Sequence, residues 1–292
     1  SSSGLVFSNV YLSNSKKETL NNFTIKRVAR LYPLHLLTLF LVILIQSFFL
    51  KIYGKYELYT FNDFYHFFLN LILLLGWGFE EGRSFNTPVW TVGQEMVIYF
   101  IFFSILLLIK KYKIKTVLIS YLIFLVIDKI KLADLDLLVN YISFSYFIEF
   151  ARLFFSGVLI YFIIKKIQYS KLFLFISLLI IIASFIGTFK LHLFCFGIVL
   201  LFVNLDQFNL SNQIKKTFNF LGSLTYSIYL LHTLTFLIFL FILKLINKIE
   251  WFYFDYTFIF YLVFTFFVSI ISFNFFENKF NKLIRNKFIK YE

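Results

Sequence analysis

The sequence predicts an all-α protein that crosses a membrane many times, and its composition carries that prediction. Hydrophobic residues make up 60% of the 292-residue chain, and only 15% of the residues are charged. A soluble domain of this length has too little interior to bury so much apolar surface. Several apolar runs also approach the roughly 20 residues that a helix needs to cross a bilayer. The short alternating segments of an outer-membrane barrel do not occur.

The formal net charge of +13 comes from Lys and Arg residues that stand in short segments between the apolar runs. In such positions they orient helices in the membrane, so we expect membrane lipids and no nucleic acid as partners. The single cysteine, Cys195, cannot form an internal disulfide. No spacing typical of metal ligands occurs, and we expect neither a metal nor a bound cofactor.

The first element is a short mixed segment, residues 1–12, which we interpret as the stub of a helix. Because the chain starts at Ser1 and its only methionine is Met96, we expect that a first helix is missing before it. The first complete span is expected at about 31–50. It would carry Pro33 in its first turn, where proline costs little.

The next apolar run, 64–79, is short and is flanked by Gly and Glu residues. We expect it to be re-entrant or interfacial rather than spanning. Seven further runs are long enough, which makes about eight complete transmembrane helices in one integral-membrane domain, 1–292. These seven spans are expected at about 89–109, 116–132, 141–164, 172–188, 190–204, 220–245 and 254–276.

Charge parity supports this count. If 64–79 does not cross, every basic segment falls on one side of the membrane, and the positive-inside rule identifies that side as the cytoplasm. Those segments are 16–30, 110–115, 165–171, 205–216 and 277–292. The C-terminus is therefore expected in the cytoplasm.

A polar stretch at the start of the 89–109 run contains Asn86, Trp90, Glu95 and Tyr99. At about 100° per residue, Glu95 and Tyr99 share one helix face. A carboxylate in an apolar helix must be paired, protonated or wet, so Glu95 is a candidate for acid–base chemistry or for orienting a catalytic group. The alternative is an interfacial residue that reaches the headgroups beside Trp90.

Two further groups of polar residues accompany it. Arg27 and Arg30 are three residues apart, so their guanidinium groups can face one way and grip a phosphate. The alternative is that both only anchor the topology. Tyr226, Tyr229 and His232 fall on one helix face, where they form either a polar seam or ordinary packing around a satisfied histidine.

Four segments, in order, carry a resemblance to a known family. They are 3–6 (Ser-Gly-Leu-Val), 26–35, 86–99 and 221–232. They resemble the motifs of membrane-bound acyltransferase family 3, whose members are O-acyltransferases that modify bacterial surface glycans. Two positions depart from the pattern: Thr91 replaces a serine, and Lys26 replaces the first of two arginines.

The resemblance implies ten spans in the complete protein and a catalytic histidine upstream of Ser1. It implies transfer of an acyl group, acetyl being expected, from acyl-CoA in the cytoplasm to a hydroxyl of a cell-surface glycan or lipid-linked sugar. Acetyl-CoA would be a co-substrate, and the location would be the inner (cytoplasmic) membrane of a bacterium. Glu95 and Tyr99 would be catalytic, and Arg27 and Arg30 would bind the donor. The pocket would comprise Asn86, Trp90, Tyr226, Tyr229 and His232.

Two other functions fit the same residues. A transporter or flippase for a glycan or lipid would also place Glu, Arg and His inside the membrane. The other alternative is that a chain without its first helix is catalytically inactive and acts only as a membrane scaffold.

Overall fold

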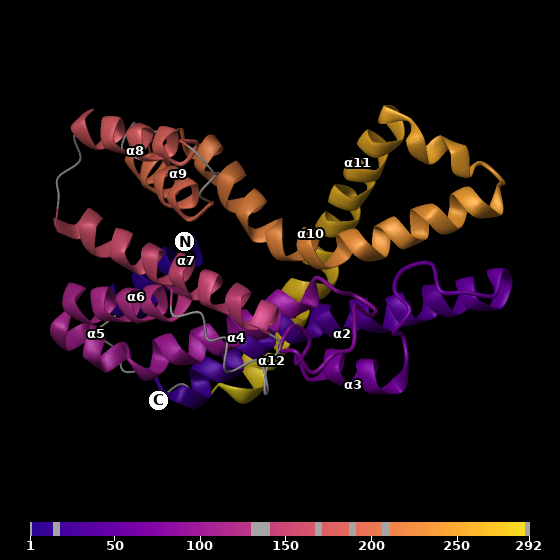
Figure 1. Cartoon of the computed structure of the whole chain (residues 1–292), viewed down its shortest axis with the longest axis horizontal. Coiled ribbons are helices and arrows are strands. Elements are labelled where there is room, and N and C mark those ends of the chain that lie inside the picture. Colours follow the sequence, from indigo (N-terminus) through magenta and orange to yellow (C-terminus); the bar gives the residue numbers. More distant parts are fainter. Residues whose placement is uncertain are drawn as a thin grey trace. The chain divides into compact units, whose positions relative to one another are not determined.

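The computed structural model describes residues 2–13, 18–129, 141–166, 171–186, 191–205 and 211–289, and this part contains helices without any strand. The all-α prediction is therefore confirmed for the described residues. They form two compact units. Figure 1 labels their helices. The first unit comprises Ser1–Glu18 and Gln94–Lys215, and the second comprises Thr19–Gly93 and Lys216–Glu292.

The first unit is built around α7 (Tyr141–Lys166), against which α1 (Ser2–Ser13) and α6 (Ile114–Lys129) pack. It also contains the end of α4 (Val89–Ser104), α5 (Leu106–Tyr112), α8 (Lys171–Ala183) and α9 (Leu191–Leu205). Gly4 lets α1 approach α7 closely, since a Cβ there would lie 1.9 Å from the carbonyl oxygen of Phe154. The Phe7 ring stacks on Tyr99, with centroids 4.1 Å apart, and meets Phe154 edge-on at 5.6 Å.

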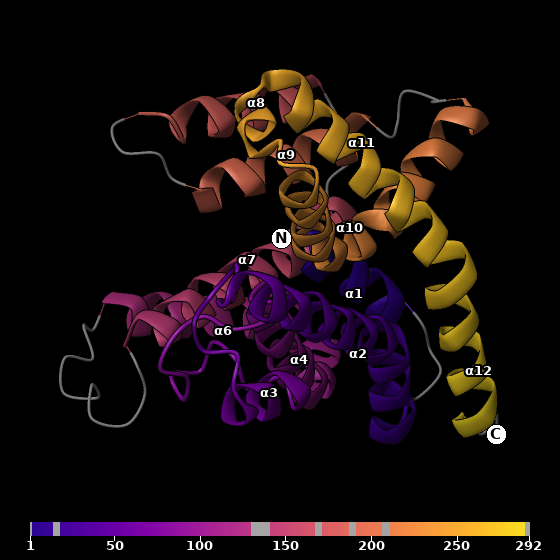
Figure 2. The ribbon, with the colours of Figure 1, turned by 90° about the vertical axis from the view of Figure 1, so that its right-hand side faces the viewer.

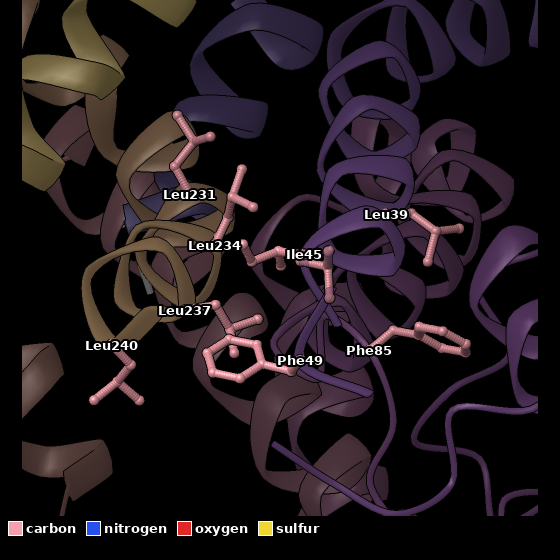
Figure 3. Packing of buried hydrophobic residues seen from close by; sticks show 9 residues of the cluster. Leu39, Ile45, Phe49, Phe85, Leu231, Leu234, Leu237 and Leu240 are labelled. Carbon is pink, nitrogen blue, oxygen red and sulfur yellow. The ribbon is translucent and has the colours of Figure 1, made fainter. Parts of the chain in front are cut away.

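The second unit is built around α2 (Leu20–Tyr53) and α10 (Asn212–Leu245). Leucines three residues apart on α10, from Leu231 to Leu240, pack with Ile45 and Phe49 of α2 in one buried cluster (Figure 3). The unit also contains α3 (Phe64–Leu71), the start of α4, a 3-10 helix (Ile249–Tyr253), α11 (Asp255–Ser272), a π-helical turn (Phe273–Glu277) and α12 (Asn278–Phe288).

Helix α11, the π-helical turn and α12 continue one another as a single long helix (Figure 2). The turn and α12 both pack against α2. The basic tail after residue 276 was expected to follow the last span. Instead it continues that span as α12, and the π-helical turn at the junction carries Glu277. A π turn inserts an extra residue and re-aims the side chains around it, as is often seen at functional sites.

Two expectations about α2 are wrong, its start and the position of Pro33. The helix begins at Leu20, with Thr19 as its N-cap accepting from the backbone N–H of Asn22 at 3.2 Å, rather than at residue 31. Pro33 therefore lies inside the helix and not in its first turn. It cannot donate to the carbonyl of Ala29, which removes one helical hydrogen bond. The segment with Arg27 and Arg30 is thereby part of the same helix as the apolar span.

Four described helical segments are long and apolar enough to cross a membrane, by length and composition: Leu20–Tyr53, Tyr146–Lys165, Asn212–Leu245 and Asp255–Phe288. A fifth is the pair α4 and α5, which bends by 50° after Ser104 where one straight span over 89–109 was expected. Helix α3 has 8 residues and ends at Leu71. At about 1.5 Å per residue it is too short to cross a bilayer, as expected for 64–79.

The count of eight spans stays a prediction. Helices α6, α8 and α9 have 16, 13 and 15 residues, below the length that a straight span needs. The chain next to them, 130–140, 187–190 and 206–210, lies outside the described residues. So do parts of the predicted basic segments, including Lys16 and Lys17.

Candidate active site

A buried carboxylate joins three helical elements of the second unit. Glu277, in the π-helical turn, is 1% exposed, and its Oε1 lies 2.9 Å from Nη1 of Arg30 on α2. Its Oε2 accepts a hydrogen bond of 2.6 Å from Ser227 on α10. A buried carboxylate is tolerated inside a membrane helix when a cation and a donor satisfy it. The side chain of Arg30 is 32% exposed, so this pair is open on the side of the guanidinium.

Further contacts fix Arg30 and its neighbours. Its Nη2 lies 3.4 Å from the backbone carbonyl of Ser223, and Tyr226 donates to the carbonyl of Leu31 at 2.5 Å. Arg27, one turn before Arg30, lies with its guanidinium carbon 5.7 Å from the ring centroid of Phe23. The predicted Arg27–Arg30 face therefore exists on α2, and Arg30 is engaged by Glu277.

Asn86 is a fully buried bridge between α2 and α10. Its side-chain amide donates to Thr38 Oγ1 and to the carbonyl of Leu230, both at 3.1 Å. Its Oδ1 is buried and has no hydrogen-bond partner among the described residues. The predicted pocket residue Asn86 thus lies where the segment before α4 meets the two long helices.

The start of α4 is tied to the tyrosine segment of α10. Tyr229 donates to the carbonyl of Pro88 at 2.8 Å, and its hydroxyl accepts from Thr91 at 2.8 Å. Trp90 is half-buried, and Gly76 leaves room for it, since a Cβ there would lie 2.7 Å from Trp90 Cβ. The structure therefore brings together two of the segments that the sequence singled out.

The contacts of His232 place a proton on Nδ1. This nitrogen lies 2.6 Å from the carbonyl of Tyr229, so Nδ1–H donates, and the tautomer of the ring that fits this contact has its lone pair on Nε2. Nε2 is 3.5 Å from the hydroxyl of Thr233, at the limit of a hydrogen bond. The backbone carbonyl of His232 accepts from Tyr261 of α11 at 3.0 Å. A half-buried histidine with an available Nε2 can accept a proton.

A second histidine, His35 on α2, lies fully buried one turn before Thr38. Its Nε2 donates to the carbonyl of Asn70 at 3.0 Å, and its Nδ1 has no hydrogen-bond partner among the described residues. The amide of Asn70 in turn donates to Ser84 at 3.0 Å. These contacts hold the loop after α3 against α2.

The start of α3 carries an aspartate–histidine pair. Asp63 caps α3 by accepting from the backbone N–H of His66 at 2.9 Å, and it also lies 2.8 Å from His66 Nδ1. These bonds, the backbone one first, hold the pKa of Asp63 below its usual value. His66 Nε2 accepts from the backbone N–H of Glu81 at 3.3 Å, so the ring connects α3 to the loop that follows it.

Glu95 and Tyr99 belong to the first unit. Both lie on α4, so the predicted spacing of one turn is present, and Glu95 is half-buried. The ring of Tyr99 stacks on Phe7 and lies 5.9 Å from Phe154, which gives it a packing role. The catalytic role of the two residues stays a prediction.

Comparison of the chain with known protein families identifies its family. The model of an acyltransferase domain, that of acyltransferase family 3, matches residues 2–274. The chain belongs to this acyltransferase family. No curated protein and no solved structure matches it. With its apolar helices, the acyltransferase is a membrane protein, and acyl transfer is its general chemistry.

Sequence reasoning missed Glu277 of the acyltransferase, although a signal was present. Glu277 is the only acidic residue between Asp255 and Glu292. It stands directly after an apolar run, at the start of the basic tail. An isolated acid there needs a partner. Thr38, Asn70 and Ser227 gave no such signal, because Thr, Asn and Ser within helices are common and only packing shows what they contact.

Proposed function

We propose that this acyltransferase moves an acyl group, acetyl being the simplest, from acyl-CoA at the cytoplasmic face to a hydroxyl of a cell-surface glycan or lipid-linked sugar. The observation that supports it most is the pair of hydrogen bonds between the start of α4 and α10. There Thr91 and Pro88 meet Tyr229 at 2.8 Å, so two segments that resemble the family's motifs converge beside His232. We further propose a multi-pass protein of a bacterial inner membrane, with eight spans in this chain and a cytoplasmic C-terminus.

The chemistry needs a base for the acceptor. In the proposed step, the acceptor hydroxyl gives its proton to His232 Nε2 while its oxygen attacks the thioester carbonyl. The carbon–sulfur bond then breaks, and the coenzyme A thiolate leaves and takes the proton from His232 Nε2, which restores the base. The Nδ1–H bond to the carbonyl of Tyr229 supports this role, because it fixes the tautomer that leaves Nε2 unprotonated. Asn86 and Tyr229 would shape the pocket wall.

Glu95 has an electrostatic role in this proposal, and Tyr99 positions its helix. The test measures acyl ester formed on the glycan by the whole protein in its membrane. Glu95→Gln keeps the shape of the side chain and removes its charge. We expect acyl transfer to fall by about a hundredfold or more, while the protein still inserts normally into the membrane. Glu95→Asp should keep part of the activity. Glu149→Gln, which neutralises another half-buried carboxylate of the first unit, is the matched control and should stay active.

Three results would contradict the proposal. Full transfer in Glu95→Gln would reduce Glu95 to an interfacial anchor. An acyl group trapped on Glu95 itself would mean a covalent mechanism. Movement of glycan across the membrane without any ester product would mean a transporter.

Arg27 and Arg30 are proposed to bind the donor phosphates. Arg27→Ala should raise the donor KM, since a hydrogen bond to a charged group is worth about 1.5–3 kcal/mol. Arg30→Ala also breaks the pair with Glu277, so Glu277→Gln is its control. If Glu277→Gln alone raises the donor KM as much as Arg30→Ala does, Arg30 acts by holding the helices and not by binding phosphate.

A further inference from the structure

The first unit contains a basic cavity that the proposed mechanism does not use. Its volume is about 440 Å³, and Lys110, Lys113 and Lys165 line it together with Tyr161. No carboxylate is among the described residues that line it. Three lysines come from two segments, the α5–α6 junction and the end of α7. Both were predicted from their charge to lie on the same side of the membrane.

Tyr161 contributes a polar atom that lacks a partner. Its side chain is 5% exposed, and its hydroxyl is buried without a hydrogen-bond partner among the described residues. Lys165, one turn further along α7, lies with its Nζ 4.7 Å from the centroid of the tyrosine ring. Leaving a buried hydroxyl unsatisfied is costly, so a ligand that accepts its hydrogen bond would remove the cost.

The backbone at the cavity is also unusual. Lys113, between α5 and α6, has a φ of +52°, and its N–H donates to the carbonyl of Ile109 at 2.8 Å. A side chain other than Gly rarely adopts this conformation, which is held at a cost that folding of the surroundings must offset. It turns the chain so that α6 begins at Ile114, which also lines the cavity. The first N–H groups of a helix attract anions.

We propose that this cavity binds a phosphate monoester. Three ammonium groups, a helix start and a phenol are all hydrogen-bond donors, and a phosphate monoester carries up to two negative charges and three acceptor oxygens. A neutral or cationic ligand would not complement the positive charges of Lys113 and Lys165. Two sources share this chemistry: the 3′-phosphate of coenzyme A, which rests on the proposed function, and a lipid with a terminal phosphate, such as phosphatidic acid.

The test is a comparison of two ligands that differ only in that phosphate. The whole protein is placed in nanodiscs of phosphatidylcholine, and binding of coenzyme A and of 3′-dephospho-coenzyme A is measured. We expect coenzyme A to bind at least about tenfold more tightly, equivalent to about 1.4 kcal/mol. In the double variant Lys113→Ala with Lys165→Ala this preference should disappear, with dephospho-coenzyme A binding unchanged. Lys111→Ala removes the same charge from the end of α5, outside the cavity lining, and should keep the preference.

Tyr161→Phe separates ligand binding from structure. It removes only the unpartnered hydroxyl and leaves the ring beside Lys165, so the melting temperature without ligand should be unchanged or higher. Affinity for coenzyme A should fall a few-fold. A lower melting temperature with unchanged affinity would show that the hydroxyl serves the fold, and it would count against the site.

A lipid arm distinguishes the two sources. If coenzyme A shows no phosphate preference, or does not bind, the wild type should retain phosphatidic acid over phosphatidylcholine and the double variant should lose this selectivity. That outcome supports the site and assigns it to a lipid, and absence of coenzyme A binding would then weaken the proposed function alone. If neither ligand class responds to the lysine substitutions, the proposal is overturned, whatever the transfer activity.

Discussion

The two units of this acyltransferase have different internal contacts. In the second unit, side chains bond to groups far away in the sequence, as where Asn86 joins Thr38 and Leu230 and where Glu277 joins Arg30. In the first unit, α1 meets α7 through Gly4, and aromatic rings pack around them. Polar contacts fix geometry, whereas apolar contacts tolerate adjustment. We therefore expect the apolar packing of the first unit to tolerate more substitution than the polar contacts of the second unit, with Glu95 as the exception because of its proposed role in transfer.

The chain offers a separate probe for each unit. Its three tryptophans, Trp77, Trp90 and Trp251, all lie in the second unit, and its single cysteine, Cys195, lies on α9 of the first. Tryptophan fluorescence during unfolding in detergent therefore reports the second unit, and labelling of the Cys195 thiol reports the first. The predictions on Asn86 and Gly4 use both readouts, and that on Glu277 uses tryptophan fluorescence.

Glu277→Leu should give the largest effect. It leaves Arg30 beside an apolar side chain, and breaking a buried ion pair costs about 3–5 kcal/mol, with the lower end expected because Arg30 is partly exposed. The tryptophan signal should change at lower denaturant. The double variant Arg30→Leu with Glu277→Leu should recover part of the loss, because no charge is left unpaired. A double variant less stable than Glu277→Leu would contradict the pairing.

Asn86→Leu should come next. It removes two hydrogen bonds and leaves the carbonyl of Leu230 without its donor, which costs about 1–3 kcal/mol. The tryptophan transition should shift while Cys195 labelling does not. Asn62→Leu removes another buried amide of the same unit, one that bonds to Leu58, Tyr59 and Phe85 and not to α10, so it is the control for the general cost of losing a hydrogen-bonded amide. Transfer activity should fall more for Asn86→Leu if Asn86 shapes the pocket.

Gly4→Ala tests the first unit. The added methyl would lie 1.9 Å from the carbonyl oxygen of Phe154, so α1 must shift, at a cost of about 1–3 kcal/mol for overpacking. Cys195 labelling should become faster and the tryptophan transition should stay in place. Gly222→Ala, where nothing lies within 4 Å of the added carbon, should be neutral in both readouts. A tryptophan shift in Gly4→Ala alone would show that the two units do not unfold separately.

The smallest effect is expected from pH. The pKa of Asp63 is lowered by its bonds to His66, so its contribution to stability is present above the usual pKa of an aspartate and is lost as pH falls through the lowered value. Acid should therefore destabilise the second unit slightly more in the wild type than in Asp63→Asn. Equal acid sensitivity in both proteins would mean that the cap does not depend on the charge.

The sequence by itself determined the class of this protein and pointed to several segments whose polar residues are buried or half-buried in the structure. Apolar runs and their periodicity depend on local composition, so the helices and the segments around Arg30, Asn86 and His232 could be predicted. Helix ends were less certain. Helix α2 begins at Leu20 and runs through Pro33, because tertiary packing offsets the cost of the helical hydrogen bond that the proline removes. The α4–α5 bend was likewise absent from the apolar pattern.

Only the tertiary structure decided which polar groups meet. Glu277 and Arg30 lie near opposite ends of the chain, and their pairing depends on how α12 and the π-helical turn pack on α2. The lysine cavity likewise joins α5, α6 and α7, which no single apolar pattern connects. Sequence periodicity specifies which face of a helix is polar. The partner of that face is set by helix packing, a property of the whole unit.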